Sequence, residues 1–188
     1  LEDLWDHADL DEVFREAHAQ IERAILWGFD VTYLSSHLGA MERRAEFFGV
    51  YLELAEEYRL PVRLPSASDQ RSLGVPLSSL AAQAGVLSPD HVVAVRGGSA
   101  RGTIEQALSN LEPGVTELRL RPAVDTPELR ALGGDWADRV GDLDVAMDAD
   151  ISVLMQRAGA ELIGWAELRR AMGRRSGSSV EAARTGRT

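Results

Sequence analysis

Apolar residues recur at helical spacing over much of the chain. Between residues 8 and 27 they return every three or four positions, until Gly28 interrupts the pattern. From residue 43 to 58 the same spacing places Phe47, Tyr51 and Leu54 on one face. Both segments therefore predict amphipathic helices.

Shorter apolar runs, bounded by glycine, proline or polar residues, alternate with further helical patterns. The runs predict strands over 31–35, 60–64, 91–95, 115–120 and 160–163. Helices are predicted over 76–84, 99–111, 126–132, 136–143, 150–157 and 165–172. The helix over 99–111 follows the strand over 91–95, and Ser99 is its predicted cap. The acidic start and the serine-rich segment before residue 76 predict loops. Alternating strands and helices predict an α/β fold with parallel strands and helices outside.

His37 follows the first predicted strand, and Gly39 then breaks the chain direction. In α/β folds, side chains just past the carboxyl end of a strand point into the crevice where chemistry occurs. His37 is therefore a candidate metal ligand or acid/base residue, and the alternative is a hydrogen-bonded structural histidine. Arg63 lies at the end of the next predicted strand, where its guanidinium could bind a polar oxygen or close the rim through a salt bridge.

Composition excludes several chemistries. The chain has no cysteine, so disulfides and thiol nucleophiles are excluded, and a reducing cytoplasm is the compatible location. All 20 basic residues are arginine, which excludes Schiff-base lysine chemistry. The net charge of −10 argues against nucleic acid as a partner. No apolar run is long enough to predict a membrane span.

Other candidate sites fit known motifs poorly. Four aspartates lie between residues 142 and 150, but the EF-hand glycine is absent, so they are interpreted as solvated helix-end charges. His18 and His91 have no partner at metal-ligand spacing and are interpreted as surface or capping residues. Gly97 and Gly98 predict a turn. From residue 174 onward too few apolar residues remain to pack, which predicts a disordered tail over 174–188.

Four segments in order resemble the YdjC-like (ChbG/HpnK) carbohydrate deacetylases. They are Asp30-Val-Thr-Tyr-Leu-Ser-Ser-His37, then 46–65, 113–123 and Glu161-Leu-Ile-Gly-Trp165. The resemblance implies a metal-dependent hydrolase that removes acetyl groups from N-acetylated sugars or oligosaccharides. It also implies a distorted (β/α) barrel and a divalent cation, magnesium or zinc, held by one aspartate and two histidines. In this chain, His37 is the matching metal ligand.

The chain also departs from the family pattern. Where the family has Thr-His-x-Asp-Ser-His, Tyr33 replaces the first histidine and Ser35 the aspartate. Arg121 stands where relatives place a histidine that assists proton transfer. Arginine stays protonated near neutral pH, so Arg121 can bind a substrate but cannot exchange its proton. No catalytic residue is therefore assigned, Arg63 and Arg121 are the substrate-binding candidates, and the departures leave open whether any metal is bound.

A barrel of this kind needs about 250 residues and eight strand-helix units, more than this chain offers. Residues 1–173 are therefore interpreted as the carboxyl-terminal part of a partial TIM-like barrel. We expect His37, Arg63 and Arg121 on one rim, and an exposed apolar edge that favours homo-oligomers or aggregation. The first functional hypothesis is a YdjC-like deacetylase that is incomplete or inactive as it stands. The second is a non-catalytic sugar-binding or protein-interaction module.

Overall fold

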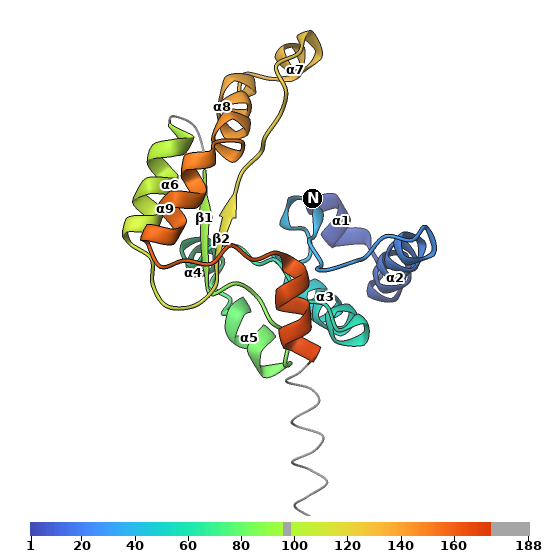
Figure 1. Cartoon of the computed structure of the whole chain (residues 1–188). Helices are drawn as coiled ribbons and strands as arrows, with labels where there is room; N and C mark the ends of the chain where they lie inside the picture. Colours follow the sequence, from blue (N-terminus) through green and yellow to red (C-terminus); the bar gives the residue numbers. More distant parts are fainter. Residues whose placement is uncertain (96–98, 174–188) are drawn as a thin grey trace, which may run out of the picture. The chain divides into compact units, whose positions relative to one another are not determined.

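A computed structural model describes residues 1–95 and 99–173 (Figure 1). The predicted turn at Gly97 and Gly98 and the predicted tail over 174–188 lie outside these residues. The fold combines helices with a small parallel sheet, as the alternating pattern predicts. The chain divides into two compact units, one of residues 1–88 with the segment that starts at residue 164, and one of residues 89–163.

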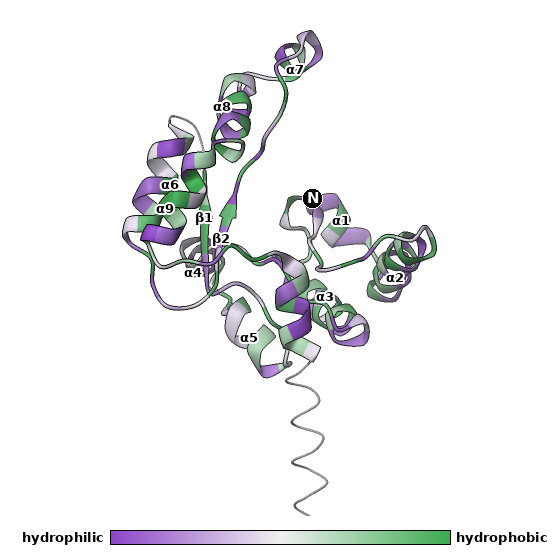
Figure 2. Ribbon diagram, in the orientation of Figure 1, coloured by the Kyte–Doolittle hydropathy of each residue, from purple (hydrophilic) through white to green (hydrophobic). Residues whose placement is uncertain are grey.

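The first unit is built mainly of helices. They are α1 (Glu2–His7), α2 (Leu10–Leu26), the 3-10 turn η1 (His37–Gly39), α3 (Ala45–Tyr58), α4 (Ala67–Leu73), α5 (Leu77–Gln83), and a last helix that is described over 165–173. Asp9 caps α2 by accepting a hydrogen bond from the Glu12 N–H at 3.1 Å. Figure 2 shows both hydrophobic and hydrophilic residues on α2. Its apolar residues Leu10, Val13 and Ala17 recur at helical spacing and pack against the core, as expected of a helix with one buried face.

The core of the first unit forms around α3. Phe48, Tyr51 and Leu54 are at most 3% exposed, and Ala55 is fully buried. These side chains pack in one cluster with Leu34 and with Met172 of the last helix. Each large apolar side chain buried in this way contributes roughly 1.5–3 kcal/mol to stability.

Helices α2 and α3 are also joined by polar contacts. The Tyr58 hydroxyl donates to Glu22 at 2.7 Å, and burial together with Glu22 raises the pKa of Tyr58. His18 lies 3.4 Å from Glu57, and its ring packs against Tyr58 with centroids 5.5 Å apart. His18 is thus a partly exposed residue that ties two helices together, rather than an isolated surface side chain.

The first two predicted strands are reduced to one parallel bridge between Leu34 and Val62. The Leu34 N–H donates to the Pro61 carbonyl and the Arg63 N–H donates to Leu34, both at 2.9 Å. The Val62 N–H donates to the Leu87 carbonyl at 2.9 Å, which ties the segment after α5 to the bridge. Proline has no N–H, and Pro61 therefore limits how far the ladder can extend.

The second unit contains a strand–helix–strand motif followed by three helices. Its elements are β1 (His91–Ala94), α6 (Ala100–Ser109), β2 (Thr116–Arg119), α7 (Pro127–Leu132), α8 (Trp136–Ala146) and α9 (Ala149–Arg157). The two strands pair in parallel, with His91 opposite Thr116. Ser99 caps α6, as predicted, by accepting from the Gly102 N–H at 3.0 Å. Val95, Ile104 and Val145 form the centre of a separate core.

Three predictions of local structure are wrong. The acidic start forms α1, which Trp5 anchors by donating to the Ala40 carbonyl at 2.9 Å. The serine-rich segment forms α4, because Ser66 caps it by accepting from the Asp69 N–H. Residues 160–163 form no strand, and Leu162 is 79% exposed.

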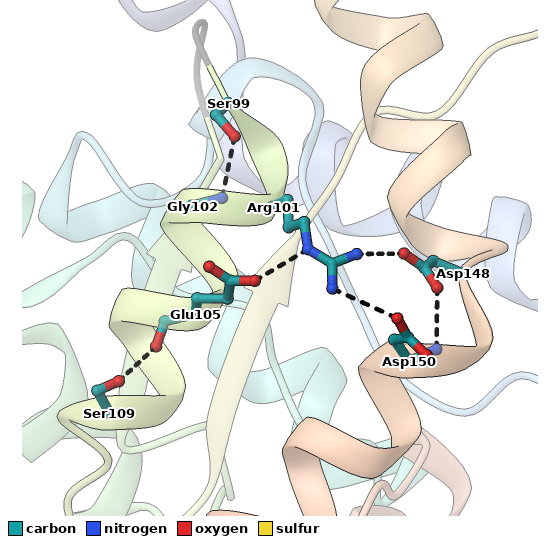
Figure 3. Close-up of polar contacts among 7 residues, drawn as sticks. All are labelled: Ser99, Arg101, Gly102, Glu105, Ser109, Asp148 and Asp150. Atoms are coloured by element: carbon teal, nitrogen blue, oxygen red, sulfur yellow. Dashed lines mark hydrogen bonds and ion pairs between the residues drawn. The ribbon is translucent and has the colours of Figure 1, made fainter.

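An arginine links α6 to the start of α9 in the second unit (Figure 3). The Arg101 guanidinium binds Glu105 at 2.9 Å, Asp148, and Asp150 at 3.7 Å. Asp148 also caps α9 by accepting from the Asp150 N–H at 2.9 Å. This backbone hydrogen bond, with Arg101, holds the pKa of Asp148 below its ordinary value.

This network predicts a loss of stability in acid. A carboxylate with a lowered folded pKa stabilises the fold fully above its unfolded pKa of about 3.9, and the contribution is lost as the pH falls through the folded value. We therefore expect Asp148→Asn to lower the melting temperature at pH 7 and to have a smaller effect at pH 2–3. Circular dichroism melts across this range test the prediction. An equal loss at every pH would contradict it.

Candidate functional site

Three side chains from distant parts of the first unit meet beside the bridged segments. The rings of Tyr33 and Trp165 stack with centroids 4.3 Å apart and planes inclined by 17°. The Arg63 guanidinium carbon lies 5.2 Å from the centre of the Tyr33 ring and 5.8 Å from that of Trp165. Tyr33, Arg63 and Trp165 are named here the aromatic–arginine cluster, and each of them is partly buried.

The bridged segments set the positions of Tyr33 and Arg63. Each is the direct neighbour of a bridge residue, Leu34 or Val62, whose side chain is buried in the core. Because successive side chains of an extended segment point to opposite faces, Tyr33 and Arg63 lie on the face away from that core. The Tyr51 hydroxyl donates to the Leu34 carbonyl at 2.7 Å and ties the segment to α3.

The last helix brings Trp165 to this face. Arg169 donates to the Val31 carbonyl at 2.6 Å and to the Asp30 carboxylate at 2.7 Å. On the same helix, Leu168 and Met172 are buried at 9% and 4% exposure. The residues that dock the helix thus lie within two turns of Trp165, and they hold the indole against Tyr33.

His37 lies close by in sequence, on the loop that follows Tyr33. It begins η1 and its side chain is exposed. The next residue, Leu38, has φ 55° and ψ 18°, a left-handed conformation that is costly for a side chain of this size. Ser36 anchors the loop by donating to Glu42, which is only 5% exposed, and by accepting from the Met41 N–H at 3.3 Å. The loop is therefore held in a defined shape that presents His37 outward.

Arg121 belongs to the second unit and is engaged by two aspartates. Its N–H donates to Asp142 at 2.7 Å, and its guanidinium lies 3.0 Å from Asp135. Arg139 binds the same Asp135 oxygen at 3.1 Å. Asp142 is 4% exposed within α8, so the interpretation of this aspartate as a solvated helix-end charge is wrong. It is a buried acceptor that fixes the backbone after β2.

The structure thus places His37 and Arg63 in the first unit and Arg121 in the second. The shared rim that was predicted for the three residues stays a prediction. Within the described ranges, no three or more histidine, cysteine, aspartate or glutamate side chains gather as a metal-binding group would require. Tyr33, at the position of the family's first histidine, is stacked on Trp165. The donors in these ranges therefore do not fit a site of one aspartate and two histidines.

Sequence reasoning assigned no role to Trp165 or Glu42. Trp165 ends the segment 161–165, which matched the family pattern, and that match was its only signal. Glu42 carried no signal, because its burial depends on how the loop after His37 folds back.

Comparison with known proteins agrees with the resemblance. Residues 1–157 match the family described as YdjC-like protein. A carbohydrate deacetylase from Thermus thermophilus is 37% identical over 149 residues, 76% of this chain and 54% of the relative. One from Thermoanaerobacter pseudethanolicus is 26% identical over 148 residues, 78% of this chain and 55% of the relative. The chain thus spans about half the length of these curated relatives.

A solved structure shares the fold. It is described as a putative cellobiose-phosphate cleavage protein from Enterococcus faecalis, and it superposes with a TM-score of 0.70 at 22% identity. The match covers 87% of this chain and 62% of the other. At this identity the likeness concerns the fold alone. The family match, which covers most of the sequence, and the 37% identical relative together show that the chain belongs to the YdjC-like family.

Proposed function

We propose that this chain is part of a YdjC-like deacetylase that hydrolyses the acetamido group of N-acetylated carbohydrates, and that the chain is inactive as it stands. The observation that carries the proposal is the aromatic–arginine cluster beside the His37 loop. The names of the two curated relatives support the same substrate class. Aromatic rings offer apolar faces to the C–H groups of a sugar ring, and a guanidinium donates to hydroxyl or carbonyl oxygens.

Within this proposal, Arg63 and Arg121 bind the substrate. Arg63 lies against both rings and would contact a sugar that rests on them. The side chain of Arg121 is 49% exposed, so it retains donors that can reach a ligand while it binds Asp135. No residue is proposed as catalytic.

We propose that a divalent cation, magnesium or zinc, would find only one of its ligands in this chain. His37 would supply one ligand, and hard divalent cations need several nitrogen or oxygen donors. Since the donor set described above does not fit, we propose that this chain hydrolyses acetamido sugars at background rates. We also propose that the chain forms part of a TIM-like barrel, which the parallel pairing of β1 with β2 supports. A cytoplasmic location is proposed as well, because the sequence contains no cysteine.

A homo-oligomer is also proposed. Leu26, Trp27 and Phe29 are 80%, 70% and 64% exposed at the end of α2. Exposed apolar residues this close together favour association. Light scattering that gives the mass of a single chain would contradict this part of the proposal.

The second candidate function is a non-catalytic sugar-binding module. The stack of Tyr33 on Trp165 favours it, because an aromatic contact occupies the position where relatives place a metal-binding histidine. Metal affinity separates the two candidates. Micromolar binding of magnesium or zinc supports the deacetylase, whereas sugar binding without metal affinity supports the module.

The test is acetate release from N-acetylglucosamine oligomers, with and without added magnesium or zinc. We expect background rates for the native sequence. We also expect no rescue from the triple variant Tyr33→His, Ser35→Asp and Arg121→His, because these changes restore candidate metal ligands but no acid/base carboxylate, and no catalytic residue is proposed in this chain. Metal-dependent acetate release by this variant would show that the chain holds a complete ligand set.

A further inference from the structure

A cavity of about 300 Å³ opens in the second unit, between α6 and the first residues of the two strands. His91 and Val93 line it from β1, Thr116 from β2, Thr103, Gln106 and Ala107 from α6, and Asn110, Leu111 and Glu112 from the segment after α6. All of these residues belong to the second unit, so the cavity is separate from the aromatic–arginine cluster. Its volume lies at the lower end of the range for ligand pockets, roughly 300–1,000 Å³, which suits a single ring.

Helix α6 presents two different faces. Thr103, Gln106 and Ala107 recur at the spacing of one helical face, and this face lines the cavity. Ile104, which is 2% exposed, lies on the other side with the core. The cavity-lining residues can therefore be changed without touching the residues that hold α6 in place.

The polar groups of the cavity are suited to a polyhydroxylated ligand. The Thr103 hydroxyl donates to Ser99 at 3.2 Å, and the Asn110 amide N–H donates to the Gln106 carbonyl at 2.8 Å. The Asn110 carbonyl oxygen, the whole Gln106 amide and the Glu112 carboxylate remain to face a ligand. Amides donate and accept at once, which matches hydroxyl groups that do the same.

The charge of the lining favours a cation. Glu112 is the acidic residue of the cavity, and neither arginine nor lysine lines it; the basic residue of the lining is His91, whose ring lies 3.3 Å from the Pro113 carbonyl. A ligand ammonium would therefore meet a carboxylate without a competing guanidinium, and such a charge-assisted hydrogen bond is about twice as strong as a neutral one. Val93 and Leu111 supply an apolar wall for the C–H face of a ring.

We propose that this cavity binds one ring of an amino sugar, with the ammonium on Glu112 and the ring hydroxyls on Gln106 and Asn110. The inference rests on the lining chemistry and holds whether or not the chain hydrolyses acetamido groups. Free amino sugars are also what deacetylation of N-acetylated sugars yields, so the cavity would be a product-binding subsite if the proposed function is correct.

Glucosamine, glucose and N-acetylglucosamine serve as probes, titrated into the full chain labelled with nitrogen-15. We expect glucosamine to bind with a dissociation constant of the order of 1 mM and to shift amide signals of α6 and residues 110–112. Glucose and N-acetylglucosamine, which lack the ammonium, should bind about tenfold more weakly, the ratio that corresponds to 1.4 kcal/mol.

Two variants and one control locate the interaction. Glu112→Gln should reduce glucosamine affinity about tenfold, to the level of glucose, by removing the charged acceptor. Gln106→Leu should weaken all three sugars. Asp144→Asn removes one negative charge from an exposed position on α8 and should change none of the affinities.

Equal affinity for glucosamine and glucose, shifts confined to residues outside the cavity, or an unchanged affinity in Glu112→Gln would each overturn the proposal. A melting curve for each variant shows whether it is folded. Acetate release is measured separately. Glucosamine binding without acetate release leaves the inference about the cavity intact. Acetate release without glucosamine binding overturns that inference but leaves the proposed function standing.

Discussion

Replacing Phe48 by alanine is expected to lower the free energy of unfolding of the first unit by about 3–5 kcal/mol, the range for a fully buried phenylalanine. Phe48 is 1% exposed and packs in the cluster that joins α3 to Leu34 and Val62. Its ring lies 6.3 Å from that of Tyr51, whose hydroxyl holds the Leu34 carbonyl. The loss would therefore weaken the core and the bridged segments together.

Phe29→Ala is the matched control, because Phe29 is 64% exposed in the single chain and its removal leaves no cavity in the core. Both variants are measured at a concentration at which light scattering gives the mass of a single chain. We expect a change within about 0.5 kcal/mol for this variant. Urea denaturation followed by circular dichroism measures both free energies. Equal losses in the two variants would mean that the packing around α3 is not the main source of stability in this unit.

Local signals predicted the second unit better than the first. The helix after residue 99 follows from the Ser99 cap and apolar spacing, which act within a few residues. The strands over 91–95 and 115–120 are both present, each shortened by one or two residues. A strand–helix–strand unit of this kind carries its own pairing partner, so sequence pattern alone is informative.

The first unit depends on contacts that sequence pattern does not contain. The segment 60–64 reads as a strand, yet Pro61 limits pairing and one bridge to Leu34 remains. Trp5 stabilises a helix where composition predicted a loop, through a contact with the distant Ala40. The Ser66 cap of α4, by contrast, is a local signal, and the sequence prediction missed it. The same limitation applies to the candidate site. His37 and Arg63 could be predicted as candidates because they follow predicted strands, but the residues that contact them could not be predicted.

Trp165 illustrates the limit most clearly. Nothing near it in the sequence indicates that its indole stacks on Tyr33, because the contact forms only when the last helix docks through Arg169, Leu168 and Met172. The sequence shows Tyr33 at a position where the resemblance to the family predicts a histidine. The structure adds that an aromatic contact takes its place, with Arg63 against both rings.

Trp165→Ala is accordingly expected to have the second largest effect, on both stability and sugar binding. It removes the stack on Tyr33, worth about 0.5–1.5 kcal/mol beyond the buried area, and one of the two rings that face Arg63. We expect a total loss of about 2–4 kcal/mol in unfolding free energy, within the range for truncation of a large side chain that is mostly buried. If the proposed function is correct, affinity for N-acetylglucosamine oligomers should fall at least tenfold, about 1.4 kcal/mol.

Three further variants separate the stack from general destabilisation. Trp27→Ala removes an exposed indole that has its own arginine, Arg23, at 5.8 Å, and it should leave sugar affinity unchanged. Trp165→Phe keeps an aromatic face and should recover most of the affinity. Tyr33→Ala, combined with Trp165→Ala in a double-mutant cycle, should show a coupling energy of about 0.5–1.5 kcal/mol. Additive effects in this cycle would mean that the two rings do not stabilise each other. Full sugar affinity in a folded Trp165→Ala chain would place the sugar away from these rings and remove the main support for the proposed function.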